Sequence, residues 1–164
     1  MQKFIRVMAI TATVLVVLSL LLLLVSIPFQ SQIAAKIYKF PEELTDMLPM
    51  FPLSQFVHTF LLLGCSALMI VCCGNQKGGI WLEILLLATL ILVVPFINKV
   101  LSDVQNVFIG QVGGGSVVAA NSVVNQISSY CAWPSALGNS LALLAGGMSM
   151  AYKRMDKKLA KVTE

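Results

Sequence analysis

Long hydrophobic runs alternate with short polar segments along this chain. The apolar runs predict membrane-spanning helices at about residues 7–27, 53–73, 80–97 and 135–152. Each run holds about 18 to 21 residues, enough to cross a hydrocarbon core of roughly 30 Å. The first run follows two basic residues, as in a secretory signal peptide. Its apolar length exceeds the roughly 7–15 residues of a signal h-region, so it predicts a true span.

The composition of the chain is that of a membrane protein. Hydrophobic residues make up 58% of the sequence and charged residues 11%, whereas soluble domains average about 25% charged residues. A transmembrane β-barrel would need many short alternating strands instead of long unbroken runs. The sequence therefore predicts an all-α integral membrane protein, a single membrane domain over residues 1–164. Its expected architecture is a four-transmembrane-helix bundle with amphipathic helical outer loops.

Basic residues are distributed unequally between the two sides of the predicted membrane. Eight Lys and Arg residues fall on the side that carries both termini and the 74–79 turn, and three fall on the other side. The positive-inside rule then places both termini and the tail at 153–164 in the cytoplasm, and the loops at 28–52 and 98–134 outside. We expect a multi-pass protein of the cell (plasma) membrane. The lack of Asn-x-Ser/Thr sites in the outer loops favours a bacterial inner membrane.

The second outer loop predicts an uncharged helical hairpin. An apolar stripe indicates an amphipathic helix from about residue 98 to Gly113, Gly114 and Gly115, where it should stop, because glycine costs roughly 1 kcal/mol per helical position relative to alanine. A second helix is expected over about 117–129. The hairpin could form a cap on the outer surface or re-enter the membrane. Re-entry needs a cavity for the freed backbone groups, and because four helices enclose little space, the cap is favoured.

The fourth predicted span carries small residues at every fourth position. Gly138, Ala142 and Gly146 permit close approach of another helix, within this chain or from another protein. Asn139, on the same span, is expected to hydrogen-bond across that contact. The first span consists mostly of Val and Leu, presents no such face, and is expected to meet lipid.

Two ionisable residues lie near the predicted hydrocarbon region, where such groups are functional candidates by default. Pairing the second and third spans about their short turn separates Glu83 from His58 by roughly 15 Å, which excludes a direct proton relay. Glu83 should form a structural ion pair near the inner boundary, close to Lys77 and to the level of Lys153 and Arg154, and a transport carboxylate is the alternative. His58 is expected to be a hydrogen-bonded interfacial residue. No further ligand lies at metal-binding spacing, so no metal site is predicted.

The cysteines do not form a thiol-enzyme motif. There are four cysteines and no C-x-x-C pair, which argues against thiol–disulfide chemistry. Cys72 and Cys73 could be acylated or could simply fill small apolar spaces. Cys131 could form an intermolecular disulfide or be a small buried residue. No P-loop, dinucleotide fingerprint or nucleophile elbow occurs, so no catalytic residue, cofactor or nucleic-acid partner is predicted.

These observations favour a non-catalytic small tetraspan membrane protein that acts as an accessory or assembly subunit of a membrane protein complex. Besides the lipid bilayer, its expected partner is another membrane protein or a second copy, bound through the outer hairpin and the fourth span. A small oligomeric channel or transporter, with the glycine-hinged hairpin near its pathway and Glu83 or Asn139 lining it, is the alternative. A membrane enzyme is disfavoured because the sequence contains no nucleophile–base or metal constellation.

Overall fold

The chain is entirely helical in the part that the structure describes. The computed structural model describes residues 1–37, 53–74, 80–112 and 115–162, and every described residue after Met1 is helical. The elements are α1 (Gln2–Ile37), α2 (Leu53–Gly74), α3 (Ile80–Ala88), the π-helical turn η2 (Thr89–Val93), α4 (Val94–Val112) and α5 (Gly115–Val162). Because α3, η2 and α4 follow one another without a break, these elements form four rods.

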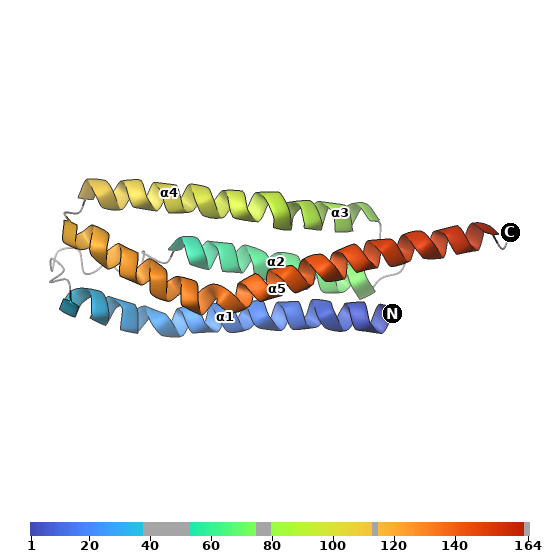
Figure 1. Cartoon of the computed structure of the whole chain (residues 1–164), viewed down its shortest axis with the longest axis horizontal. Helices are drawn as coiled ribbons and strands as arrows, with labels where there is room; N and C mark the ends of the chain where they lie inside the picture. The colour runs from blue at the N-terminus through green and yellow to red at the C-terminus, as the bar shows by residue number, and fades with distance from the viewer. Residues whose placement is uncertain (38–52, 75–79, 113–114, 163–164) are drawn as a thin grey trace.

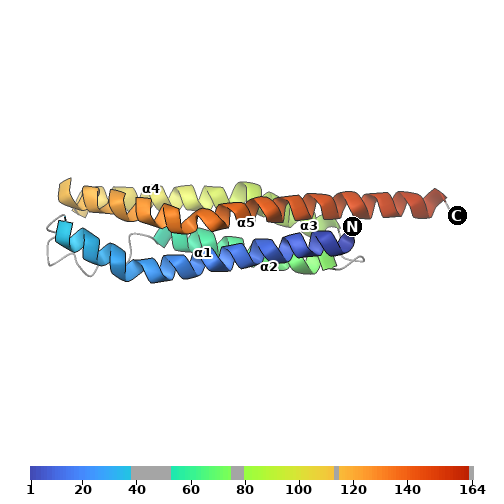
Figure 2. The same cartoon turned by 60° about the horizontal axis from the view of Figure 1, so that its bottom comes forward.

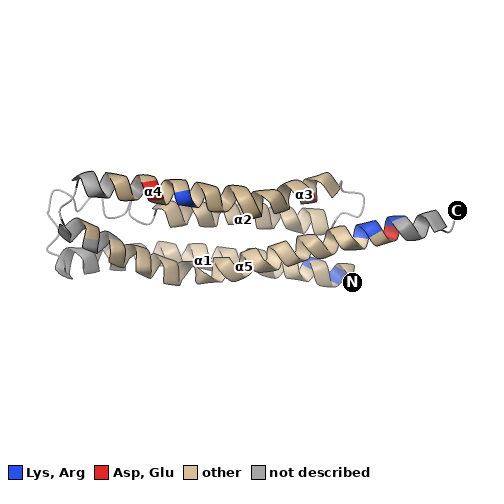
Figure 3. Ribbon diagram, turned by 45° about the horizontal axis from the view of Figure 1, so that its top comes forward, with Lys and Arg blue, Asp and Glu red and all other residues tan. Residues whose placement is uncertain are grey.

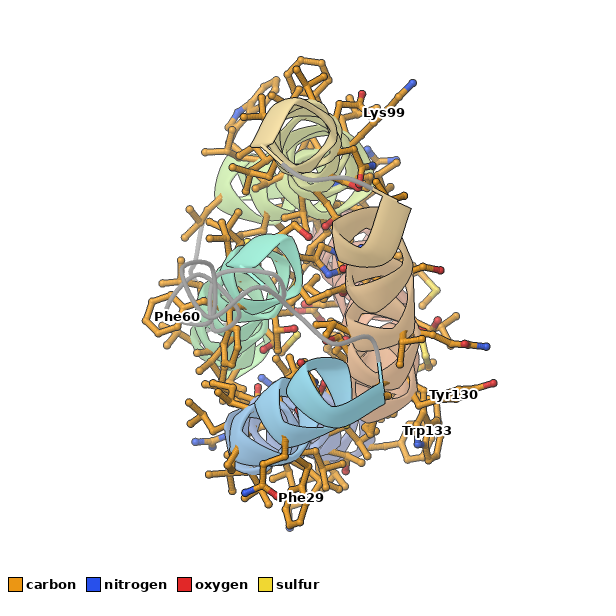
Figure 4. All side chains as sticks on the ribbon, turned by 90° about the vertical axis from the view of Figure 1, so that its left-hand side faces the viewer. Phe29, Phe60, Lys99, Tyr130 and Trp133 are labelled. Atoms are coloured by element: carbon orange, nitrogen blue, oxygen red, sulfur yellow. The ribbon has the colours of Figure 1, made fainter. Side chains whose placement is uncertain are left out.

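The rods pack side by side in an antiparallel arrangement (Figures 1 and 2). The first and third rods run away from the end that carries the N-terminus, and α2 and α5 return to it, so both termini lie at the same end (Figure 1). Seen along its length, the molecule has α1 and α4 on opposite sides, with α2 and α5 between them (Figure 4). This is the up-and-down arrangement expected of a small helical bundle.

Three helices are long and apolar enough to cross a membrane. These helical segments are Gln2–Gln30, Ser54–Cys73 and Ile80–Val104, and they correspond to the first three predicted spans, with the second beginning one residue later than predicted. α5 is not among them, because glycine, serine and asparagine residues dilute its apolar character. The structure thus supports a helical membrane protein, while a fourth crossing remains a prediction.

The helix break predicted at the three glycines is confirmed, because α4 ends at Val112 and α5 begins at Gly115, but the predicted span ends are not helix ends. α1 continues through Pro28 to Ile37, α4 continues past residue 97 to Val112, and α5 passes through Pro134 without a break. In place of a cap or re-entrant hairpin, α1, α4 and α5 extend the bundle coaxially beyond the start of α2 (Figure 1). A polar composition ends a membrane span but does not end a helix. The rest of the first loop, 38–52, and the 75–79 turn lie outside the described residues.

The third rod widens at η2. The Val94 N–H donates to the carbonyl of Thr89, five residues earlier, which is the π-helical pattern. Pro95 follows directly, has no N–H to donate, and in a regular helix its ring would meet the carbonyl of Ile91. The wide turn gives that carbonyl room and lets the rod continue.

The closest packing in the bundle joins α1 to α5. Ala9, Ala12 and Val16 on α1 and Ala142 on α5 are fully buried in the core. A Cβ placed on Gly138 would lie 2.8 Å from the carbonyl oxygen of Ala12 and 2.8 Å from Cγ2 of Val16. The prediction that the first span lacks a packing face is therefore wrong. A few small residues within a Val- and Leu-rich run are enough to let α5 approach.

Candidate functional site

A buried ion pair joins α3 to α5 at the end of the bundle that carries the termini. The Lys153 ammonium lies 2.8 Å from Oε1 of Glu83, and the Ser149 hydroxyl donates to the same oxygen at 2.6 Å. Lys153 also donates to the carbonyl oxygen of Cys72 on α2 at 3.0 Å. Glu83 is 0% exposed and Lys153 is 8% exposed. Groups from α2, α3 and α5 thus meet at this ion pair.

The positions of the two charged residues follow from the ends of two helices. Glu83 lies in the first turn of α3, where the helix dipole stabilises a negative charge. Cys72 lies in the last turn of α2, whose final carbonyls have no partner within the helix. The Lys153 ammonium supplies a donor there and neutralises Glu83 at the same time. The cluster therefore satisfies polar groups that the junction of α2 and α3 would otherwise leave buried.

The predicted ion pair is confirmed, with Lys153 as its partner, and both side chains are buried within the bundle. Lys77 lies outside the described residues, and Arg154 is exposed. Trp81, two positions before Glu83, is 82% exposed. The sequence marks Ser149 only as one of the small residues of the fourth span, because a serine among small residues does not reveal a hydrogen bond until its facing helix is known.

Three buried side-chain oxygens have no hydrogen-bond partner within the described part of the chain. They are Oε2 of Glu83, Oδ1 of Asn98 on α4 and Oδ1 of Asn139 on α5. The expected hydrogen bond from Asn139 across a helix contact is therefore not formed by this oxygen. The sequence analysis did not identify Asn98 as a buried polar residue. Its position is nevertheless regular, because it follows the buried residues Leu90 and Val94 at helical spacing on the inner side of the third rod.

His58 does not take part in the ion-pair cluster. It is partly buried on α2, fourteen residues before Cys72, a separation of about 21 Å along the helix. This distance agrees with the exclusion of a Glu83–His58 relay. Within the described residues, no group of three or more His, Cys, Asp or Glu side chains could hold a metal ion.

The small-residue face of α5 is used inside the chain. Gly138 packs on α1, and a Cβ on Gly146 would lie 2.8 Å from Cε of Met69 on α2 and 3.0 Å from Cδ2 of Leu87 on α3. Ala142, between the two glycines, is fully buried. This face is therefore closed to any other protein. Of the glycines at the predicted hinge, Gly115 begins α5, while Gly113 and Gly114 lie outside the described residues.

A second polar contact fastens α5 at the opposite end of the bundle. The Gln30 amide on α1 donates to the Ser128 hydroxyl at 3.2 Å and to the Ser26 hydroxyl at 2.7 Å. Ser19 donates to the carbonyl oxygen of Cys131 at 3.1 Å. Sequence reasoning missed this contact, because its partners are 98 residues apart and helical periodicity does not tell which rods face each other. Polar groups therefore hold α5 to the bundle at both ends.

All four cysteines are free thiols. Cys72 and Cys73 are 4% and 3% exposed, and Sγ of Cys73 lies 3.9 Å from the carbonyl oxygen of Ala145. Burial at a helix contact favours their interpretation as small fillers over acylation. Cys131 is partly exposed on α5.

Comparison with protein-family models, curated proteins and solved structures gives no match. The function must therefore be argued from the surfaces and buried groups of the molecule itself.

Proposed function

We propose that the chain is a non-catalytic accessory or assembly subunit of a membrane protein complex, and that it binds a transmembrane helix of its partner along the outward side of α5. The observation that carries this proposal is a row of exposed residues along α5, which is the least apolar of the helices. The buried polar groups described above join helices to one another and offer no nucleophile paired with a base.

The outward side of α5 has the spacing of a helix–helix contact. Exposed residues recur at alternating intervals of three and four, which is the seam of a left-handed helix pair. They are Tyr130, Trp133, Leu137, Ser140, Leu144, Gly147 and Ala151. Tyr130 and Trp133 project away from the bundle (Figure 4). Large residues at 137 and 144 alternate with small ones at 140 and 147, so a facing helix would find both knobs and holes.

Gly147 distinguishes this stripe from the internal packing face. A Cβ on Gly138 or Gly146 would meet neighbouring atoms at 2.8 Å, whereas a Cβ on Gly147 would meet nothing within 4 Å. Glycine costs roughly 1 kcal/mol in a helix relative to alanine, and the fold of this chain does not require that cost at position 147. Small residues on a membrane helix surface allow another helix to approach closely.

The proposed arrangement includes a fourth crossing by α5. Twenty residues separate Trp133 from Lys153, or about 30 Å of helix, which is the thickness of the hydrocarbon core. Because α5 is less apolar than the other spans, a partner helix on its outward side would shield its serine and glycine positions from lipid.

The proposed location is the cell membrane, with both termini in the cytoplasm. Lys3, Arg6, Arg154 and Lys157 are exposed at the end that carries the termini, where Figure 3 shows basic residues on α1 and α5. Lys99 and Asp103, of opposite charge, lie on the distal half of the third rod. This imbalance supports the orientation given by the positive-inside rule. A reporter fused after Glu164 that is active only outside the cytoplasm tests it, and activity of that reporter would refute the orientation.

The partner proposal predicts that Gly147→Leu abolishes recovery of a stoichiometric partner when the tagged chain is purified from its native membrane in mild detergent. Leucine fits the open space at position 147, so the chain should fold normally while the seam is blocked. Gly64→Leu on α2 is the matched control, because a Cβ there also meets nothing within 4 Å. Equal recovery from both variants, or a native chain without any partner, would contradict the proposal.

Transport is the second candidate function, favoured by the three unpartnered buried oxygens. Carboxylate and amide oxygens inside a membrane helix bundle attract protons, cations or water. If the chain conducts, Glu83→Gln and Asn139→Leu should each lower ion flux into liposomes that contain the purified protein. No flux from the native chain, or flux that neither substitution changes, would remove this candidate.

A further inference from the structure

Three polar residues lie inside the half of the bundle that is away from the termini. Oδ1 of Asn98 on α4 and Oδ1 of Asn139 on α5 are buried and have no hydrogen-bond partner among the described residues. His58 on α2 is partly buried. We call these three residues the polar layer.

The members of the polar layer come from three helices but lie at similar depth. A Cβ on Gly146 of α5 would touch Met69 of α2 and Leu87 of α3, so these three positions share one level. Away from the termini, the members on α2 and α4 are each eleven residues beyond this level, and the member on α5 is seven beyond it. At 1.5 Å per residue these separations are about 16 and 10 Å, so the layer is about 6 Å deep.

The polar layer adjoins the apolar core of the bundle. Each member is the next residue, at an interval of three or four, in a buried row on its own helix. The rows are Leu90 and Val94 on the third rod, Leu62, Cys65 and Met69 on α2, and Ala142 and Gly146 on α5. Within these rows the side chains change from apolar to polar at the layer, so the layer marks one end of the apolar core.

Water or lipid headgroups lie close to the level of this layer. Lys99 directly follows Asn98 and projects away from the bundle (Figure 4). Because an exposed charge is costly in hydrocarbon, its level indicates the edge of the membrane core. Trp133, the edge of the core on α5 in the arrangement proposed above, lies six residues from Asn139, or about 9 Å. The α5 member of the layer is therefore inside the core, but within a short distance of water.

The unpartnered oxygens require hydrogen-bond donors. Buried acceptors in folded proteins are nearly always paired, with ordered water where no protein donor is present. Pro95 adds to the demand, since it has no N–H and leaves a carbonyl of η2 without its helical donor. No positive side chain of the described residues donates to either amide oxygen, and water is the small donor available at the nearby edge.

We propose that water enters the bundle from the end opposite the termini and hydrogen-bonds to the polar layer, as far as Asn139. Ala142, one turn further along α5 and fully buried among apolar residues, limits its entry. The interior is thus wet in one half and dry in the other. This water would supply half of a pathway for the transport candidate, but its presence does not depend on transport or on the outward stripe of α5.

The test uses the full chain carrying Cys131→Ser in nanodiscs, with added single cysteines and a permanently charged, water-borne methanethiosulfonate as the probe. Asn139→Cys should react at least about tenfold faster than Ala142→Cys, because a buried thiol away from water is inert. The native cysteines at 65, 72 and 73 are buried and provide the background rate. Leu137→Cys is the control for access through lipid, since Leu137 is 47% exposed on the outward side of α5 and two residues nearer the membrane edge.

Equal rates at positions 139 and 142 would overturn the proposal, as would a rate at position 137 as high as that at 139. Absence of ion flux through the native chain would remove the transport candidate and leave this proposal standing, because the labelling measures water alone.

A second measurement does not depend on labelling. If the layer is dry, Asn98→Leu and Asn139→Leu should each raise the SDS midpoint of unfolding, because each removes a buried acceptor that has no partner. If the layer holds water, leucine displaces that water without replacing its hydrogen bonds, and both midpoints should fall. We expect both to fall, and a midpoint raised by either substitution would contradict the proposal.

Discussion

Glu83→Leu should lower the free energy of unfolding by about 3–5 kcal/mol, the cost of leaving one member of a buried ion pair without its partner. Lys153 would remain 8% exposed among α2, α3 and α5, with only the carbonyl of Cys72 to accept from it. Lys153→Met should cost about as much, because it leaves the Glu83 carboxyl buried without its counter-ion and with only the Ser149 hydroxyl to donate to it. SDS-induced unfolding in mixed micelles, followed by far-UV circular dichroism, measures both losses.

The decisive comparison is the double variant Glu83→Leu/Lys153→Met. Replacing a whole buried pair by apolar residues of similar volume is often neutral or stabilising, and the Ser149 hydroxyl can then bond to a carbonyl of its own helix. We therefore expect the double variant to recover most of the stability that either single variant loses. A double variant as unstable as the sum of the two singles would show that the pair does not act as a unit.

Gly138→Leu should be the most damaging substitution on the small-residue face of α5. Its Cβ alone would lie 2.8 Å from the backbone carbonyl oxygen of Ala12. A backbone atom cannot relieve this clash by a change of rotamer, as a side-chain atom can. Overpacking of this kind costs about 1–3 kcal/mol, or more where the structure cannot relax. The same SDS titration measures the loss.

A graded series makes this prediction sharper. At Gly146 the nearest atoms belong to the flexible side chain of Met69, so Gly146→Leu should cost less than Gly138→Leu. A Cβ added to Gly147 would meet nothing within 4 Å, so Gly147→Leu should leave stability unchanged or raise it, since glycine is a poor helix former. The reverse order of stabilities would mean that α5 is rotated relative to α1 in the folded molecule.

The hydrophobic pattern predicted most of the helices of the bundle, because the length of an apolar run determines whether a helix can cross the hydrocarbon core. The three apolar helices and the pairing of Glu83 with Lys153 were both predictable, since Glu83 lies near the start of the third span and Lys153 directly follows the fourth, on the side of the predicted membrane that carries the termini. The small-residue face was correctly expected at a helix contact, but the sequence left open whether α1 or another protein supplied the facing helix.

The errors have a common physical origin. A helix from about residue 98 to the glycines was predicted correctly, but the sequence did not show that it continues the third span as one rod, because a change from apolar to polar residues does not end a helix. The fourth span was predicted to begin at about residue 135, but α5 already begins at Gly115 and runs through Pro134. The Gln30–Ser128 contact and the unpartnered Asn98 depend on which rods face each other, and that information arises only when the rods assemble.

The length of α5 has a mechanical consequence. Its 48 residues form one uninterrupted helix, about 72 Å long. The tight contact at Gly138 lies close to its midpoint, about 34 Å from one tip and 36 Å from the other. The hydrogen bond to Ser128 lies on one side of this contact and the ion pair of Lys153 lies on the other. Any tilt of α5 about Gly138 would therefore break buried polar contacts on both sides, so the rod is braced at three levels along its length.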